Sequence, residues 1–334
     1  MNPVKKLRYR LEYAAVQSAA KLLQALPLGV AQAAGRGAGR AAWALGVARA
    51  AANENLAERL GLRGAERRRV ASAAYANFGQ TMGELAWMPA LDPAQLDTMF
   101  TFDGLEQMQA AKDAGKGIVC MSAHYGNWEW MGAALIRRGF KVTYLIGTQS
   151  NPWVDALFNQ YRAKVGIQFV RISDIRGGLK VLKAGGLVAL LGDQDGDKWG
   201  TFAPFFGGQA STHSIGELLA RRSGAALAFG VPVRLGPRSH HLKVEMIPAP
   251  PEGLSEVQGT AWTLARYNAL LEAAIREHPE QWLWMHHRWR SVPKHRLAGL
   301  DRALAEKGEI AFDLEAQAWR RVPGGEAHPV EGWK

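Results

Sequence analysis

The sequence has 334 residues, and 48% of them are hydrophobic, which allows a sizeable core and argues against a disordered protein. Lys and Arg number 41 against 30 Asp and Glu, and the resulting formal net charge of +11 indicates an anionic partner. Twelve tryptophans beside this charge favour a membrane surface. No nucleic-acid-binding module is recognisable, so we expect no nucleic acid partner.

Residues 1–90 are predicted to be helical because they are rich in Ala and Leu. Pro27 and the glycines at 35, 37 and 39 are expected to break this region. Four basic residues at positions 5, 6, 8 and 10 precede an apolar stretch that polar residues at 12, 17 and 21 interrupt. A spanning helix needs about 20 apolar residues without such interruptions. Two interpretations therefore stay open, an amphipathic helix on an anionic membrane surface and an ordinary helix packed on its own domain.

From about residue 115 the pattern changes to short β-branched runs that alternate with helical stretches. Strands are predicted over 117–122, 141–146, 167–172 and 187–191, and an antiparallel pair over 225–235 and 241–247. Helices are predicted up to 136, from 151, and over 174–184, 214–222 and 255–277. This alternation predicts an α/β fold, a central mixed sheet flanked by helices. We expect three regions: a helical N-terminal region over 1–90, an α/β core over 91–294 and a peripheral tail over 295–334.

A polar motif follows the strand predicted over 117–122. His124 lies at the carboxyl end of this strand, where open α/β sheets bind their ligands. Gly126 permits a tight turn, Asn127 can cap the next helix, and Glu129 falls in the first turn of that helix. A carboxylate that orients an imidazole suits the activation of a hydroxyl. The alternative is a strand-end histidine bonded to the backbone, with a surface glutamate.

The spacing His124-x4-Glu129 matches the His-x4-Asp/Glu motif of the glycerolipid acyltransferase superfamily. Its form here, His-Tyr-Gly-Asn-Trp-Glu, resembles the lipid A late acyltransferases, the lauroyl and myristoyl transferases of lipopolysaccharide synthesis. Position 129 holds Glu where the wider superfamily more often has Asp, and Glu is familiar in the lipid A branch. The resemblance covers roughly residues 5–290, with further matches at Asn53–Leu56, Tyr75, Asn77–Phe78, Glu84, Gly192–Asp195, Phe202–Gly207 and His278–Trp284.

The resemblance implies a glycerolipid acyltransferase-like fold and a role for each matching residue. His124 would deprotonate a hydroxyl of the acceptor, which attacks an acyl thioester carried on acyl carrier protein or coenzyme A. Glu129 would orient His124, and Arg171 would bind a phosphate with its planar fork. Asn127, Asp193 and Gln194 would line the substrate pocket, with Asp195 beside them. We expect neither a metal nor a cofactor.

Several acceptors and functions fit these residues. The resemblance favours a lipid A precursor as the anionic lipid acceptor, at the cytoplasmic face of the cell inner membrane. A phosphatidylinositol mannoside, an ornithine lipid or a lysophospholipid also presents a hydroxyl beside a polar head. A non-catalytic lipid-binding protein on the same scaffold is the alternative from another class. A serine hydrolase is disfavoured because the chain has no Gly-x-Ser-x-Gly motif.

Three other features have simpler interpretations. Cys120 is the single cysteine and lies in a strand-like run, so we expect a buried, unreactive thiol. Ser211 and Thr212 are interpreted as caps of the following helix, with His213 beside them. The segment 282–290, with three tryptophans and two arginines, is interpreted as a patch at the membrane interface.

Overall fold

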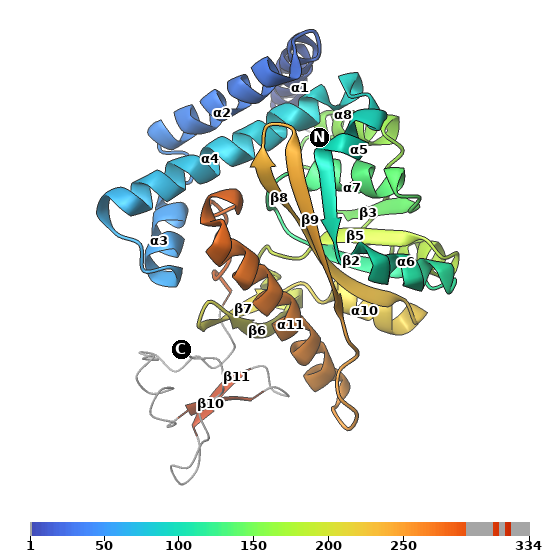
Figure 1. The fold of residues 1–334 in the computed structure, drawn as a ribbon. Coiled ribbons are helices and arrows are strands. Elements are labelled where there is room, and N and C mark those ends of the chain that lie inside the picture. Colours follow the sequence, from blue (N-terminus) through green and yellow to red (C-terminus); the bar gives the residue numbers. More distant parts are fainter. Residues whose placement is uncertain (1, 292–309, 314–317, 322–334) are drawn as a thin grey trace.

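The computed structural model describes residues 2–291, 310–313 and 318–321. The chain begins with four helices, so the predicted helical N-terminal region is confirmed (Figure 1). Asn2 caps the first helix through a hydrogen bond that its side chain accepts from the Val4 N–H, and Pro27 precedes the second. The four helices are α1 (Pro3–Gln24), α2 (Leu28–Ala44), α3 (Arg49–Arg59) and α4 (Gly64–Trp87).

A seven-stranded sheet in the order β1-β9-β8-β2-β5-β3-β4 forms the centre of the molecule. Strands β8 and β9 pair antiparallel and the other pairs are parallel, which confirms the predicted α/β fold with a mixed sheet. The edge strand β1 was not predicted, since four residues carry little pattern. The strands are β1 (Phe100–Asp103), β2 (Ile118–Ser122), β3 (Val142–Ile146), β4 (Gln168–Arg171), β5 (Leu187–Leu191), β8 (Ala226–Gly236) and β9 (Ser239–Ile247).

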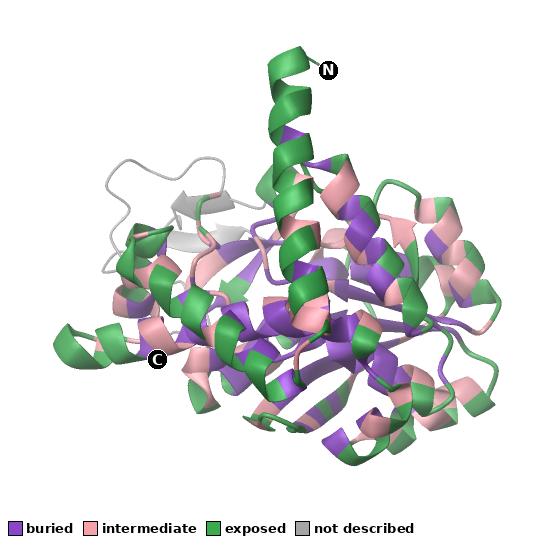
Figure 2. Ribbon diagram, turned by 90° about the horizontal axis from the view of Figure 1, so that it is seen from above, coloured by how far each residue is buried: buried purple, intermediate pink, exposed green. Residues whose placement is uncertain are grey.

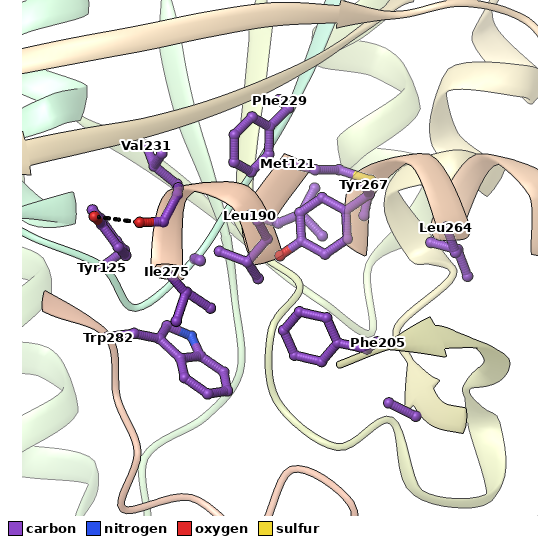
Figure 3. Packing of buried hydrophobic residues seen from close by; sticks show 14 of the residues in the cluster. Met121, Tyr125, Leu190, Phe205, Phe229, Val231, Leu264, Tyr267, Ile275 and Trp282 are labelled. Atoms are coloured by element: carbon purple, nitrogen blue, oxygen red, sulfur yellow. Dashed lines mark hydrogen bonds between the residues drawn. The ribbon is translucent and has the colours of Figure 1, made fainter. Parts of the chain in front are cut away.

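Helices cover both faces of this sheet. Successive residues of β2 point to opposite faces, so Val119 and Met121 join one core cluster and Ile118 and Cys120 join the other. Figure 3 shows the first cluster, where Tyr267 of α11 packs on Met121 and Leu190. The helices are α5 (Leu96–Met99), α6 (Leu105–Asp113), α7 (Trp128–Arg137), α8 (Pro152–Lys164), α9 (Ile175–Lys183), α10 (Ile215–Ser223) and α11 (Glu256–Glu277).

Short elements complete the described chain. A hairpin not predicted from the sequence follows β5, with strands β6 (Thr201–Phe205) and β7 (Gly208–Thr212). A second hairpin, β10 (Ile310–Asp313) and β11 (Ala318–Arg321), falls in the predicted peripheral tail, whose other residues beyond 294 lie outside the described residues. The described residues include four 3-10 turns: η1 (Met88–Ala90), η2 (Pro93–Gln95), η3 (Asp197–Trp199) and η4 (Pro279–Gln281).

Helices α2 and α4 cross at backbone contact through glycines spaced four residues apart. A Cβ atom on Gly39 would lie 2.0 Å from the Tyr75 carbonyl oxygen, and one on Gly79 would lie 2.2 Å from that of Gly35. The prediction that the glycines at 35, 37 and 39 break the helical run was wrong, because α2 continues through all three. Here glycine permits the close approach of a second helix.

A buried polar network joins these two helices to the sheet. Glu84 of α4 has no exposed surface and accepts hydrogen bonds from the side chains of Gln32, Gln80 and Asn127, at 2.7 to 2.9 Å. Arg234 of β8 donates to both of its carboxylate oxygens, at 2.6 and 2.7 Å. Burial of a carboxylate costs little free energy of folding only when the group is ion-paired and hydrogen-bonded, and Glu84 meets both conditions.

Helix α1 extends away from the rest of the molecule at its N-terminal end (Figure 2). Its Tyr9 is buried and Asn151, just before α8, donates to the Tyr9 carbonyl at 2.8 Å. The opposite side carries a stripe of exposed apolar residues, Val4, Leu7, Leu11 and Leu22, which are 61 to 75% exposed. Among the described residues, no helix combines the length and hydropathy needed to cross a membrane.

Candidate active site

His124 lies just beyond the carboxyl end of β2, and its closest polar partner comes from the neighbouring strand. Asp193 follows β5, which pairs with β2 in parallel register. One oxygen of Asp193 accepts a hydrogen bond from the backbone N–H of His124 at 2.9 Å, and the other contacts ring Nδ1 at 2.9 Å. With Nδ1 held in this way, Nε2 is the nitrogen available to a substrate, and the His124 side chain is 21% exposed.

The Asp193 carboxylate is enclosed. Its side chain is 1% exposed, and the indole Nε1 of Trp282 donates a third hydrogen bond to it at 2.9 Å. Burial alone would raise the pKa of Asp193, but the nearby His124 ring and the hydrogen bonds outweigh burial and lower it. The group is therefore a carboxylate that can stabilise a positive charge on His124.

The turn after His124 requires glycine. Gly126 has a φ of +55°, and a Cβ atom there would lie 1.8 Å from the Pro232 carbonyl oxygen. Its N–H donates to the Gln281 carbonyl at 3.0 Å, and its own carbonyl accepts from the Thr81 hydroxyl at 2.7 Å. The turn is thus held between α4 and η4, and α7 begins two residues later.

Asn127 is a structural residue in this arrangement. Its side-chain oxygen accepts from the Trp130 N–H at 2.9 Å, which caps α7, and its amide donates to Glu84 at 2.7 Å. The side chain has no exposed surface. The predicted helix cap is present, whereas the substrate contact expected from the resemblance has no accessible group to make it.

The hydrogen bonds of the Glu129 carboxylate go to Arg162 and Trp128 and not to His124, so the direct pairing predicted from the spacing is absent. The Glu129 carboxylate forms a two-bond ion pair with Arg162 of α8, at 2.6 and 2.9 Å. It also accepts a hydrogen bond from the Trp128 indole at 3.2 Å, and the Trp128 ring meets the His124 ring edge-on at 5.2 Å between centroids. Glu129 therefore reaches His124 only through Trp128.

A small cavity lies beside this ion pair. It has a volume of about 50 Å³ and is lined by Ser122, Trp128, Glu129, Arg162 and apolar residues of β3 and β5. This volume exceeds the roughly 10–15 Å³ that one water molecule needs, so the cavity can hold water. The ion pair and the Trp128 ring therefore line one cavity together with apolar residues of β3 and β5.

Arg171 lies apart from His124. It ends β4, three strands from β2, which corresponds to roughly 14 Å at the usual strand spacing. Its guanidinium is bound by both oxygens of Asp155 and by the Gly147 carbonyl at 2.9 Å. The planar fork that was expected to hold a phosphate is occupied by this carboxylate, so the structure does not support that assignment.

The residues after Asp193 face the C-terminal segment. Gln194 is half-buried, and Asp195 accepts from the Ser291 hydroxyl at 2.9 Å and lies 3.4 Å from the Arg290 guanidinium. Among the described residues, no group of three or more acidic, histidine or cysteine side chains is placed to hold a metal ion.

Two other interpretations need correction. Ser211 and Thr212 belong to β7 and do not cap α10, whose cap residue is Ser214. Segment 282–290 is largely interior, since Trp282 is 2% exposed and Trp284 and Arg288 are fully buried. The Arg288 guanidinium donates to the Ser211 carbonyl and the Thr212 hydroxyl. These tryptophans pack with Phe205 and Phe206 and do not form an interfacial patch.

Sequence reasoning missed Arg162 and Trp282, and assigned Asp193 only to the pocket lining. Arg162 lies in the last turn of α8, where a basic residue is common, so it carries no local signal of a functional role. Trp282 lay in a segment whose composition suggested a surface. Asp193 follows a buried strand, as His124 does. This shared position at the carboxyl ends of strands was the signal in the sequence that could have indicated a contact between them.

The chain is similar in sequence to proteins of known function. Residues 2–291 match the family described as bacterial lipid A biosynthesis acyltransferase. The lipid A biosynthesis lauroyltransferase of Escherichia coli K12 is 28% identical over 234 residues, which cover 69% of this chain and 74% of that protein. The palmitoleoyltransferase of the same organism is 26% identical over 236 residues, 68% and 74% of the two chains. A lipid A biosynthesis acyltransferase of Haemophilus influenzae is 26% identical over 224 residues, 66% and 68%.

Proposed function

Because this chain belongs to the bacterial lipid A biosynthesis acyltransferase family, we propose that it moves a fatty acyl chain from a thioester donor to a hydroxyl of a lipid A precursor. The chain is an acyltransferase, and the proposal concerns its donor, acceptor and site. One observation carries the proposal: a partly exposed histidine is held by a buried carboxylate at the carboxyl edge of a parallel sheet.

In the proposed reaction His124 is the general base. Its Nε2 takes the proton of the acceptor hydroxyl while the oxygen attacks the thioester carbonyl. The carbon–sulfur bond then breaks, the thiolate leaves, and the imidazolium returns the proton to the sulfur. Asp193 holds the ring through Nδ1 and stabilises the imidazolium that forms between these steps. Helix α7 begins four residues after His124, and in this proposal the positive end of its dipole stabilises the developing oxyanion.

Glu129 acts as a positioning residue in this proposal. Its ion pair with Arg162 fixes the carboxylate, and the carboxylate fixes Trp128 through the indole N–H. The Trp128 ring in turn limits the rotation of the His124 ring that it contacts. In this proposal the spacing of His124 and Glu129 leaves room for the Trp128 ring between them.

The proposed membrane association rests on α1. Asn151 follows β3, so the contact between Asn151 and Tyr9 puts α1 at the carboxyl edge of the sheet, the edge that carries His124. The same helix carries the stripe and the exposed basic residues Lys5, Lys6 and Arg10, a combination that suits an anionic lipid surface. Insertion of this stripe would bring a lipid headgroup to the side of the molecule where the base lies.

The test of the proposed function is acyl transfer by the purified protein. A lipid A precursor is incubated with a saturated acyl thioester, and the product is identified by its mass increase and by ester hydrolysis. We expect an O-acylated product with the unaltered protein and none with His124→Ala, because the base is lost while the buried core is unchanged. Turnover by the His124→Ala protein at the normal rate would reject the assignment. A product formed only with lysophospholipid would keep the base and change the acceptor.

A further inference from the structure

An arginine-rich corner is exposed where α2, α3 and α4 meet. Between residues 36 and 69 the sequence has eight arginines, three glutamates and neither lysine nor aspartate. We define the arginine corner as five exposed arginines and the two exposed apolar residues of the α2–α3 turn: Arg40, Arg49, Arg63, Arg68, Arg69, Leu45 and Val47. Within the described part of the chain, no carboxylate forms an ion pair with any of these five arginines.

The centre of the corner is apolar. Leu45 is 82% exposed and Val47 is 57% exposed, and Leu45 is thus the most exposed large hydrophobic residue of the described chain. The Tyr75 hydroxyl of α4 donates to the Val47 carbonyl, and the Arg49 guanidinium lies over the Trp43 ring at 5.5 Å, so the turn is fixed to both helices. Exposed apolar side chains surrounded by arginine are typical of protein interfaces, where arginine is enriched and lysine is depleted.

The corner adjoins one wall of the active site. Asn55 of α3 donates to the carbonyls of Trp284 and His286, at 3.0 and 2.9 Å. Trp282 in the same segment donates to Asp193, the partner of His124. A protein bound at the corner would therefore be next to the segment that holds the catalytic carboxylate.

The corner is also separate from the apolar stripe of α1. Helix α4 has 24 residues, which span about 36 Å at the usual rise. The corner lies at its N-terminal end, whereas α1 packs near the other end, where Gln24 donates to the Ala86 carbonyl at 2.7 Å (Figure 1). The two surfaces can thus contact two partners at once.

We propose that the arginine corner docks an acidic carrier protein that delivers the acyl thioester. This inference rests on the proposed function, which requires a thioester donor, and it adds the surface at which a carrier protein binds. A patch of five exposed arginines raises the association rate of an acidic protein and makes it depend on salt. The apolar centre then supplies a short-range contact that charge alone does not give.

The test compares two donors with one charge-reversed protein, Arg68→Glu with Arg69→Glu. The control is Arg176→Glu with Lys180→Glu on α9, which changes the same number of exposed charges elsewhere. With a dodecanoyl-loaded bacterial acyl carrier protein, we expect KM to rise about tenfold or more in the first variant, with kcat unchanged. With dodecanoyl-CoA, KM should change less than about twofold in both variants.

A binding measurement without turnover separates this inference from the proposed function. Fluorescence anisotropy of labelled, unacylated carrier protein should show a salt-dependent complex with the unaltered protein and with the α9 control, weakened about tenfold or more by the reversal at the corner. Loss of binding in the corner variant supports the docking site even if neither donor is turned over, in which case the proposed function alone fails. Equal carrier binding by both variants overturns the inference.

The membrane is the competing partner, and vesicles test it. Vesicles containing phosphatidylglycerol should bind the corner variant as they bind the unaltered protein. If the corner variant instead loses vesicle binding and both donors are affected equally, the corner contacts lipid and the inference is wrong. Should the double reversal fail to fold, Leu45→Ser serves as the second variant, and it should weaken carrier binding with little change in salt dependence.

Discussion

Asp193 contacts His124 twice, through the backbone N–H and through ring Nδ1, both at 2.9 Å. The first bond fixes where the strand end lies and the second fixes which ring nitrogen faces outward. Asp193→Asn keeps the shape but removes the charge that would stabilise a protonated His124. We expect kcat to fall by about 10²-fold or more, with little change in the free energy of unfolding.

The matched control for Asp193→Asn is Trp282→Phe. It removes one hydrogen bond to the same carboxylate but leaves the charge and both contacts to His124. Its kcat for acyl transfer should fall by no more than about tenfold. A larger loss in Trp282→Phe than in Asp193→Asn would mean that the indole, and not the carboxylate charge, is what His124 depends on.

The ion pair between Glu129 and Arg162 is predicted to show strong energetic coupling. The two side chains are 3% and 15% exposed. Arg162→Met leaves a buried carboxylate without its partner, which costs about 3–5 kcal/mol in such pairs, and Glu129→Gln leaves the guanidinium in the same position. The double variant should lose less than the sum of the single losses. Urea denaturation of the four proteins gives the coupling energy, and additive losses would show that the pair contributes no interaction of its own.

The stripe on α1 is predicted to insert into lipid. Leu7→Glu with Leu11→Glu should weaken binding to anionic vesicles about tenfold or more, because two exposed leucines no longer gain from burial in the acyl region. High salt should release the unaltered protein only in part, since salt does not screen an apolar contact. Leu254→Glu, on the loop before α11, is the control and should bind like the unaltered protein. Equal binding by all three proteins would place the membrane contact on another surface.

His240 is predicted to make stability depend on pH in the mildly acidic range. It is fully buried, neither ring nitrogen has a hydrogen-bond partner among the described residues, and it stacks on Phe100 at 4.8 Å. Burial, assisted by Arg234, lowers the pKa of His240 to about 3 from 6.5. The unfolded chain then binds a proton near pH 6.5 that the folded chain does not, so this contribution to stability is complete above pH 6.5 and falls as the pH drops.

Between pH 6 and 4.5 the expected loss is about 1.4 kcal/mol per pH unit, measured by urea denaturation at each pH. His240→Phe should make the slope shallower by the contribution of His240, because phenylalanine has no proton to bind, whereas His213 and His286, whose pKa values burial also lowers, keep their contributions. The exposed His287→Phe should leave the slope as it is. If the slopes of all three proteins agree, another group is responsible.

The glycine crossing of α2 and α4 is predicted to be sensitive to a single methyl group. Gly79→Ala places a Cβ atom against the Gly35 carbonyl and should destabilise the protein by about 1–3 kcal/mol. Gly37→Ala lies on the exposed side of α2 with no atom within 4 Å, and it should stabilise the helix by about 0.5–1 kcal/mol. Opposite signs for two Gly→Ala changes in thermal denaturation would verify the crossing, and a neutral Gly79→Ala would contradict it.

The strands and most helices could be predicted because each is encoded locally. The apolar run 118–122 and the antiparallel pair that became β8 and β9 follow from residue patterns within one element. His124 was found for the same reason, since its position at the end of a strand is visible in the sequence. The family resemblance also depends on local blocks of this kind.

The partners of His124 and Glu129 could not be predicted, because they depend on the order of strands. Asp193 faces His124 only because β5 lies next to β2, and Arg162 reaches Glu129 only because α8 packs beside α7. The sequence separation is 69 residues in the first case and 33 in the second. The spacing of His124 and Glu129 suggested a direct contact, but the Trp128 side chain contacts both residues and separates them.

The network around Glu84 implies that a cut of the chain at residue 90 removes hydrogen bonds that hold the turn after His124. A fragment beginning at 91 would keep Arg234 and Asn127 but lose the carboxylate that binds both, and Gly126 would lose the Thr81 hydroxyl. The exposed guanidinium would then occupy a site built for an ion pair, next to the turn that carries His124. The N-terminal helices therefore hold that turn in its conformation through these hydrogen bonds. Adding residues 1–90 as a separate peptide to the fragment should restore part of the ordered structure of the turn.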